Sequence, residues 1–349
     1  MEYINTGRRN PAAVSLRMAM DSFSRASKTS SWAVRALSIR SYSCPTYLAL
    51  YEKIIMNHFS AIEGHPPLES PNRLYFGKVA VLATLHDKDS VIAPIFQDEL
   101  GIEIQVSKID TDQFGTFAGE IPRRMSQLET AIAKARAAIS TTGIPLAVAS
   151  EGTIGPNPLI PIASSDFETL VFIDSEQELV IHESYRSSEI ITAHKIVRPG
   201  ENIDEFLAKA DFPNHGVIVR TENVQPLVAV KGIRDKAVLI QAIQDLSIGS
   251  GSAVIESDLR ASFSPSRMRN IAACARLLAR RIASMCPQCD APGWGSISPI
   301  FGLPCADCGS NVASAVMADQ YGCGKCEHRK VFARAAAVAE ARFCDSCNP

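Results

Sequence analysis

Val79-Ala80-Val81-Leu82-Ala83 is an unbroken run of five apolar residues, which is typical of a strand buried on both faces of a sheet. A helix of about ten residues is predicted next. It ends at Gly101, because glycine readily takes the left-handed conformation that closes a helix. A second strand, 102–106, follows directly. These elements predict the start of an α/β sheet.

The same alternation continues further along the chain. Ser126 begins a predicted helix that runs to about Thr142, and Gly143 separates it from an apolar strand, 146–149. Strand, helix, strand, helix, strand predicts a mixed sheet with flanking helices. Later predicted elements are a hairpin (169–173 with 179–182), a helix (203–210), a strand (216–220), a helix (235–246) and a helix opened by Ser264-Pro265 that runs to about Met285.

Eight of the ten cysteines fall after residue 285, as four CxxC pairs. Two thiolates separated by two residues offer both sulfurs to one metal ion, and two such pairs complete a tetrahedral shell. We therefore predict two structural zinc sites in a small zinc-ribbon domain. Adjacent pairs are expected to share a metal, with an interleaved pairing as the alternative. The ligands are Cys286, Cys289, Cys305, Cys308, Cys323, Cys326, Cys344 and Cys347.

Three regions are predicted along the chain: an extension in 1–72, an α/β domain in 73–284 and the ribbon domain in 285–349. Residues 1–51 are basic and rich in serine, with only Glu2 and Asp21 as acids. This composition is typical of a disordered extension and also of an organelle transit peptide. His65 to Pro71 reads as a linker.

The overall composition is that of a soluble globular chain, with 46% hydrophobic and 21% charged residues and a net charge of −2. No apolar run reaches 18 residues, so no membrane-spanning helix is expected. Thiolate ligands need a reducing compartment, so we expect the cytoplasm, or an organelle if residues 1–51 are a transit peptide.

Polar groups follow the predicted buried strands. Thr84 and Lys88 come after the strand 79–83, where a lysine beside a helix N-terminus suits a phosphate, although Lys88 also fits a solvated surface. The segment 150–156 follows the strand that ends at Ala149 and is expected to be a loop. In it, Gly152 would let the backbone approach a ligand closely, and Ser150 is also expected to contact the substrate. Glu151 would hold a metal ion or activate water.

Ser126 and Glu129 form an S-x-x-E capping box, a structural role that does not prevent Glu129 from facing a ligand. A third polar segment, 111–120, contains two glycines and aromatic residues.

Three segments together resemble a family of mainly bacterial proteins of unknown function. They are Thr-Asp-Gln-Phe-Gly-Thr-Phe-Ala-Gly-Glu (111–120), Ala-Ser-Glu-Gly-Thr-Ile-Gly-Pro (149–156) and the last CxxC pair in Cys-Asp-Ser-Cys-Asn-Pro (344–349). The resemblance spans about 77–349 and implies no particular activity.

The chain also resembles the inosine-triphosphate pyrophosphatases, in its strand and Ala83-Thr84 turn and in the Thr142-Gly143 turn before an acidic strand end. This resemblance implies that Lys88 and Lys134 contact phosphates and that Glu129 and Glu151 hold Mg²⁺. The chain departs from that family where Ala149-Ser150-Glu151 replaces a pair of aspartates before Ser-Gly.

Basic side chains also lie on the predicted helix after Ser264. Its buried stripe is Ile271, Ala275, Leu278 and Ile282. Its arginines are read as a solvated face, with a stripe that binds phosphate or nucleic acid as the alternative. They are Arg269, Arg276 and Arg280, joined by Arg260 and Arg267 near the start of the helix. From Cys286 onward, five Lys/Arg stand against six Asp/Glu, so the ribbon lacks the basic footprint of a nucleic-acid binder.

We expect a Mg²⁺-dependent nucleotide or phosphate-ester hydrolase with a structural zinc domain, acting on a small phosphorylated ligand. The alternative is a non-catalytic ligand-binding or adaptor protein that docks a protein or nucleic-acid partner through its ribbon.

Overall fold

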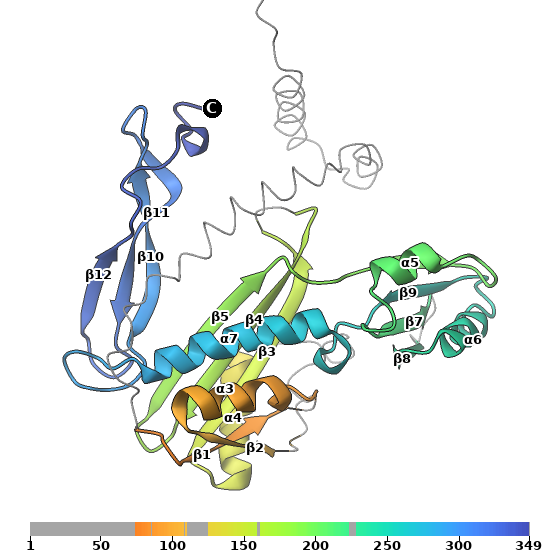
Figure 1. The fold of residues 1–349 in the computed structure, drawn as a ribbon, viewed down its shortest axis with the longest axis horizontal. Coiled ribbons are helices and arrows are strands. Elements are labelled where there is room, and N and C mark those ends of the chain that lie inside the picture. Colours follow the sequence, from red (N-terminus) through yellow and green to blue (C-terminus); the bar gives the residue numbers. More distant parts are fainter. Residues whose placement is uncertain are drawn as a thin grey trace, which may run out of the picture. The chain divides into compact units, whose positions relative to one another are not determined.

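The structure is a computed structural model that describes residues 74–84, 86–107, 109, 125–158, 161–222 and 228–348. The sequence predictions for the amino-terminal extension, the linker and the polar segment 111–120 lie outside the described residues. Figure 1 gives the order of the elements along the chain.

A mixed five-stranded sheet forms the centre of the α/β part, in the order β2-β1-β3-β4-β5. The strands β1, β2 and β3 run parallel, whereas β4 and β5 extend the sheet as an antiparallel hairpin. Their bounds are β1 (Val79–Ala83), β2 (Glu103–Ser107), β3 (Leu146–Pro156), β4 (Ser164–Asp174) and β5 (Leu179–Ser187). The predicted mixed α/β fold is confirmed.

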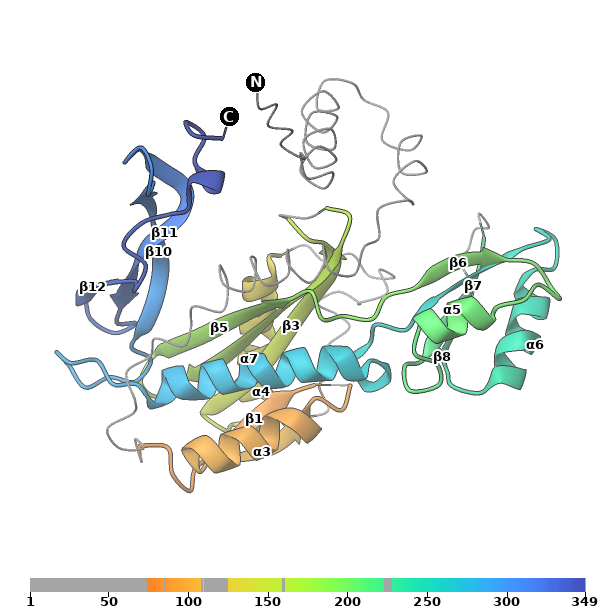
Figure 2. The same ribbon diagram turned by 45° about the horizontal axis from the view of Figure 1, so that its top comes forward.

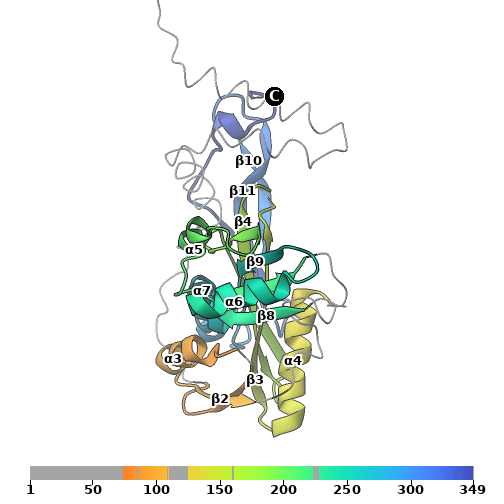
Figure 3. The ribbon, with the colours of Figure 1, turned by 90° about the vertical axis from the view of Figure 1, so that its right-hand side faces the viewer.

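Helices cover both faces of this sheet. Side chains of α3 (Asp89–Leu100) and α7 (Pro265–Ala283) share one apolar core with β1, β3, β4 and β5, and α4 (Gln127–Thr142) packs on the opposite face. Figure 3 shows α3 and α4 on opposite sides of the sheet. The predicted helix ends are confirmed, because Gly101 and Gly143 both take positive φ angles of 66° and 72°.

One segment differs from its prediction in a way that matters for the site. Residues 150–156 are not a loop, because β3 continues through them to Pro156 and pairs with β4 along its whole length. β1 stops at Ala83, opposite Ala149, so β3 extends beyond its parallel neighbour. Gly152, Gly155 and Pro156 suggest a loop in the sequence. They lie in a strand because β4 pairs with β3 along this whole stretch.

A second sheet, in the order β6-β9-β7-β8, is antiparallel throughout. The helices α5 and α6 pack on one of its faces and bury a separate apolar core (Figure 2). The elements are β6 (His194–Val197), α5 (Asp204–Lys209), β7 (Val217–Thr221), β8 (Ala229–Ile233), α6 (Lys236–Leu246) and β9 (Ala253–Ser257). The other face of this sheet contributes to a groove described below.

The cysteine-rich region folds as a third, antiparallel sheet in the order β10-β11-β12. Arg281 of α7 joins it to the rest, since its guanidinium donates to the carbonyls of Gly293 and Ser296. The strands are β10 (Gly295–Pro304), β11 (Asn311–Gly322) and β12 (Arg329–Ala333). The boundaries 1–72, 73–284 and 285–349 stay predictions. Within the described ranges, no helix is both long and apolar enough to cross a membrane.

Candidate functional site

Lys88 is buried at the carboxyl end of β1, where it also begins α3. Its side chain is only 7% exposed, and Nζ donates to Ser150 Oγ at 2.9 Å. Burial lowers the pKa of Lys88 to about 8, and the nearby Glu168 carboxylate partly opposes that effect. The surface-lysine alternative is therefore wrong.

Lys134 and Glu151 meet on the other face of the sheet. Ala147 and Ala149 of β3 face α4, and Glu151 continues that alternation, so its carboxylate reaches Lys134 Nζ at 2.6 Å. Both side chains are buried. This ion pair occupies an oxygen of Glu151, which the sequence assigns to a magnesium ion.

Two further predicted positions, Glu129 and Thr84, lie apart from these pairs. Glu129 is exposed and completes the predicted capping box, accepting from the Ser126 backbone N–H at 2.9 Å while Ser126 Oγ accepts from the Glu129 N–H. Thr84 is buried, and its hydroxyl accepts from the His86 N–H in the turn after β1. The structure thus joins Lys88 to Ser150 and Lys134 to Glu151, but brings Glu129 into neither pair.

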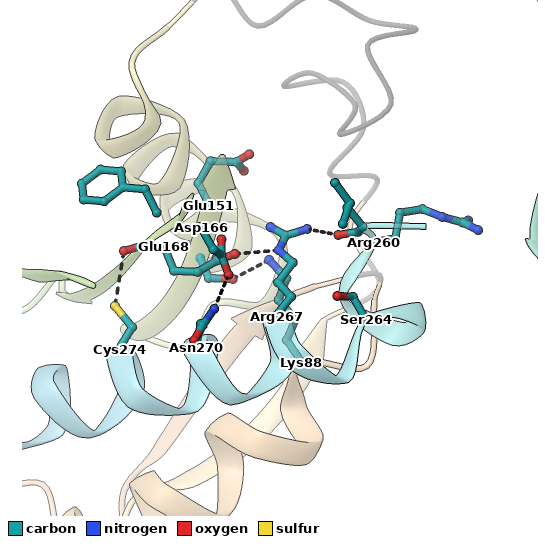
Figure 4. Close-up of polar contacts among 12 residues, drawn as sticks. Lys88, Glu151, Asp166, Glu168, Arg260, Ser264, Arg267, Asn270 and Cys274 are labelled. Atoms are coloured by element: carbon teal, nitrogen blue, oxygen red, sulfur yellow. Dashed lines mark hydrogen bonds and ion pairs between the residues drawn. The ribbon is translucent and has the colours of Figure 1, made fainter. Parts of the chain in front are cut away.

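A buried charge cluster that the sequence did not predict lies beside Lys88. Arg267 Nε donates to Glu168 Oε1 at 2.6 Å, and Asn270 Nδ2 donates to Asp166 Oδ2 at 2.9 Å (Figure 4). Gly152 pairs with Glu168 across the sheet, and a side chain at Gly152 would overlap that carboxylate and the guanidinium of Arg267. The assignment of Arg267 to a solvated arginine face is wrong, because its side chain is buried by the sheet.

One sequence signal could have found this cluster. Arg267 stands four residues before Ile271, seven before Cys274 and eleven before Leu278, so helical periodicity puts it on the buried stripe of α7. A buried arginine requires an acidic partner, and Glu168 lies in a strand that the sequence predicts only from Thr169 onward.

A groove of about 1350 Å³ lies against the cluster. Its walls are the ends of β3 and β4, the open face of β7, β8 and β9, and the segment 258–260. Arg267 connects cluster and groove, because its Nη1 donates to the carbonyl of Leu259 at 2.9 Å. Arg267 thus fixes the segment 258–260 that lines the groove, and the backbone at the end of β3 forms another part of the wall.

The groove carries more positive than negative side chains. Its basic residues are Lys209, Arg220, Lys231 and Arg260, and its acids are Glu256 and Asp258, which leaves a formal balance of four minus two, or +2. Glu256 pairs with Arg220, and Asp258 holds Arg260 at 2.6 Å. These two pairs fix both arginines in the wall.

Asp211, His215 and Ser266 are hydrogen-bonded in the order found in serine hydrolases. His215 Nδ1 contacts Asp211 Oδ2 at 2.8 Å, and Nε2 contacts Ser266 Oγ at 3.0 Å. However, Ser266 is only 1% exposed, and its hydroxyl also accepts from the Ile191 N–H. The Ser266 N–H donates to Nε2 as well, so the network ties the start of α7 to the turn after α5.

The eight cysteines of the CxxC pairs form two tetrads, and the pairing is interleaved. Sulfur–sulfur distances of 3.6–3.8 Å within them fit a tetrahedral zinc shell, in which bonds of about 2.3 Å place sulfurs about 3.8 Å apart. The expected adjacent pairing is wrong, because β10 carries the second CxxC pair away from the first and the antiparallel β11 brings the third pair back to it. The tetrads are Cys286, Cys289, Cys323 and Cys326, and Cys305, Cys308, Cys344 and Cys347.

Aromatic side chains cover the first tetrad. Trp294 packs in one cluster with Cys286 and Cys323, and its ring stacks on His328 with centroids 5.0 Å apart. A closed shell of four thiolates leaves no coordination position for a substrate, so these sites suit structure rather than catalysis.

Comparison with known proteins adds one match. No curated protein matches the chain. Residues 134–349 match the domain of unknown function DUF6671, a region that includes the end of α4, the acid-bearing strands, α7 and both cysteine tetrads. The match is narrower than the 77–349 resemblance seen in the sequence, yet it covers more than half of the chain. The chain therefore belongs to the DUF6671 family.

Proposed function

We propose that this protein is a zinc-stabilised binding protein whose groove takes a small anionic ligand that bears phosphate. The observation that carries the proposal is the groove of about 1350 Å³ with its excess of basic side chains. Binding sites for small molecules usually enclose about 300–1000 Å³, so this groove can hold a ligand of nucleotide size or larger.

The lining favours phosphate over a strand of nucleic acid. Arg220 and Arg260 are held in place by acids, and fixed guanidinium groups suit the planar, bidentate recognition of phosphate oxygens. Among the described residues that line the groove, none is Phe, Tyr or Trp, so it lacks the stacking platform on which single-stranded nucleic acids bind.

The metal is proposed to be zinc, with the two cysteine tetrads as its ligands. Four thiolates at tetrahedral spacing are the donor set that zinc prefers in structural sites. Zinc would supply cross-links to the third sheet and no chemistry to the groove. Thiolate ligands need reduced cysteines, which supports a cytoplasmic location; docking of a protein partner through the ribbon stays a prediction.

The test is a titration with inorganic pyrophosphate and with ATP by calorimetry. Lys209 and Lys231 line the groove, so the double variant Lys209→Gln, Lys231→Gln should weaken binding at least about tenfold. Lys236→Gln is the matched control, because Lys236 is exposed on α6, pairs with Asp204 and does not line the groove. Equal affinity in the double variant and the control would remove the groove as the binding site.

A second candidate, a Mg²⁺-dependent phosphate-ester hydrolase, is favoured by one observation. The Lys88–Ser150 and Lys134–Glu151 pairs lie on opposite faces of the sheet, both beside the part of β3 that continues past the end of β1. Open α/β sheets bind ligands beyond strand carboxyl ends. In this proposal Lys88 and Lys134 hold the phosphate, and Glu151 leaves Lys134 to bind a metal ion that activates water.

Pyrophosphate release from nucleoside triphosphates in the presence of Mg²⁺ distinguishes the two candidates. Turnover that is lost in Glu151→Gln supports the hydrolase, whereas binding without turnover on any triphosphate supports the binding protein. Turnover that Glu151→Gln leaves unchanged would count against this assignment of the catalytic group.

A further inference from the structure

We propose that Asp166 and Glu168 form a proton-binding site, in which a single proton on Asp166 Oδ1 is donated to Glu168 Oε2. The two residues are separated by one position on β4, so their side chains share a face of the sheet. Both are 0% exposed, and Figure 4 shows them beside Arg267 and Asn270. The site is independent of the proposed ligand.

The two carboxyl groups leave a matched pair of orphan oxygens. Each has one oxygen in a hydrogen bond, Asp166 Oδ2 with Asn270 and Glu168 Oε1 with Arg267. Among the described residues, the fully buried Asp166 Oδ1 and Glu168 Oε2 have no partner. A buried polar atom without a hydrogen bond destabilises the fold, and one proton between these two oxygens satisfies both.

The donors show which carboxyl holds the proton. Arg267 is a permanent cation and stabilises Glu168 as a carboxylate, whereas Asn270 offers Asp166 only a neutral amide. Two buried carboxylates on one face repel each other, so the group with the weaker partner stays protonated. Asp166 is therefore the donor and Glu168 the acceptor.

The surroundings are consistent with this assignment. Burial and the charge of Glu168 raise the pKa of Asp166 to about 7, against the opposing effects of Asn270 and Arg267. Lys88 faces the cluster from the start of α3, and Cys274 of α7 contacts the carbonyls of Glu168 and of Glu183 on β5. Burial also raises the pKa values of Cys274 and Glu183, and Glu183 is paired with Arg281 at 2.8 Å.

Infrared spectroscopy tests the site directly, because a protonated carboxyl has a carbonyl band distinct from that of a carboxylate. The wild-type chain, with zinc bound, should show this band at pH 6 and lose it with a midpoint at a pH of about 7. Asp166→Asn should abolish the band. The matched control is Asp174→Asn, since Asp174 is also buried on β4 but accepts hydrogen bonds from Tyr75, Gln177 and two backbone N–H groups.

The band should persist in Asp174→Asn. Absence of a protonated-carboxyl band from the wild type below pH 7, or its persistence in Asp166→Asn, would overturn the proposal. The amide that Asp166→Asn introduces can itself donate to Glu168, so this variant is expected to fold.

The pH dependence of unfolding supplies a second measurement, with Asp166→Asn as the reference chain. The native chain keeps the proton up to about pH 7, and the unfolded chain releases it near 3.8. Native chains thus bind more protons between these values, and stability must fall as pH rises, by up to about a thousandfold in the folding equilibrium constant. This slope is opposite to that of thiolate metal sites, which weaken as pH falls. Asp166→Asn keeps the same cysteine tetrads, so the wild-type stability minus that of Asp166→Asn isolates the carboxyl. A difference that is constant or rising from pH 5.5 to 7.5 would contradict the proposal.

Discussion

Gly152 illustrates how one missing side chain makes room for a buried ion pair. A Cβ atom at this position would overlap Glu168 Oε1 and Arg267 Nη2, the two groups that anchor α7 to β4. Gly155, three positions along the same strand, has no atom within 4 Å of the corresponding point. The strand therefore tolerates a side chain at one glycine and not at the other.

Gly152→Ala should lower the free energy of unfolding by about 3 kcal/mol, because overpacking and displacement of a buried ion pair act together. Gly155→Ala is the control and should change it by less than about 0.5 kcal/mol. Urea unfolding followed by circular dichroism measures both. A similar, small effect of the two substitutions would mean that the Arg267–Glu168 pair can move aside.

At the scale of the element, α4 gives the clearest prediction from its capping box. Ser126→Ala removes the acceptor for the Glu129 N–H and should reduce stability by about 1 kcal/mol. Thr141→Ala, in the exposed last turn of α4, removes only a bond to the Ala137 carbonyl and should be nearly neutral. If urea unfolding finds Ser126→Ala equally neutral, the capping box contributes nothing to the fold.

The elements also show why prediction from the sequence stops where it does. Helix ends follow local rules, so Ser126, Gly101 and Gly143 are identified from residue type alone. The extension of β3 depends on pairing with β4, and the buried part of β4 contains Asp166 and Glu168 where an apolar pattern is normally expected. Both the extension of β3 and the burial of acids on β4 therefore depend on residues distant in sequence. Lys88 and Lys134, both predicted as site residues, contact Ser150 and Glu151. The two lysines lie on opposite faces of the sheet because Ser150 and Glu151 are consecutive residues of the extended strand β3.

At the scale of the whole molecule, the interleaved cysteine tetrads predict a definite metal count. Replacing the second and fourth CxxC pairs together by serines should leave one metal ion, because both belong to one tetrad. Replacing the first and second pairs together should leave none. Native mass spectrometry of the two quadruple variants gives the count. Adjacent pairing would predict the reverse, with no metal in the former variant and one in the latter.

Interleaving also sets the order in which the ribbon can be completed during synthesis. The first tetrad is complete only after Cys323 and Cys326 have been synthesised, and the second only after Cys344 and Cys347. The other two cysteines of each tetrad are synthesised earlier. Domains begin to fold during synthesis, so the earlier two cysteines of each tetrad lack their partner cysteines until the later pair has been added. A chain interrupted between Cys326 and Cys344 would have one finished metal site and a second pair of thiols open to oxidation or to a foreign metal. Such truncated chains should be recognisable to the cell by that pair, Cys305 and Cys308, at the turn between β10 and β11.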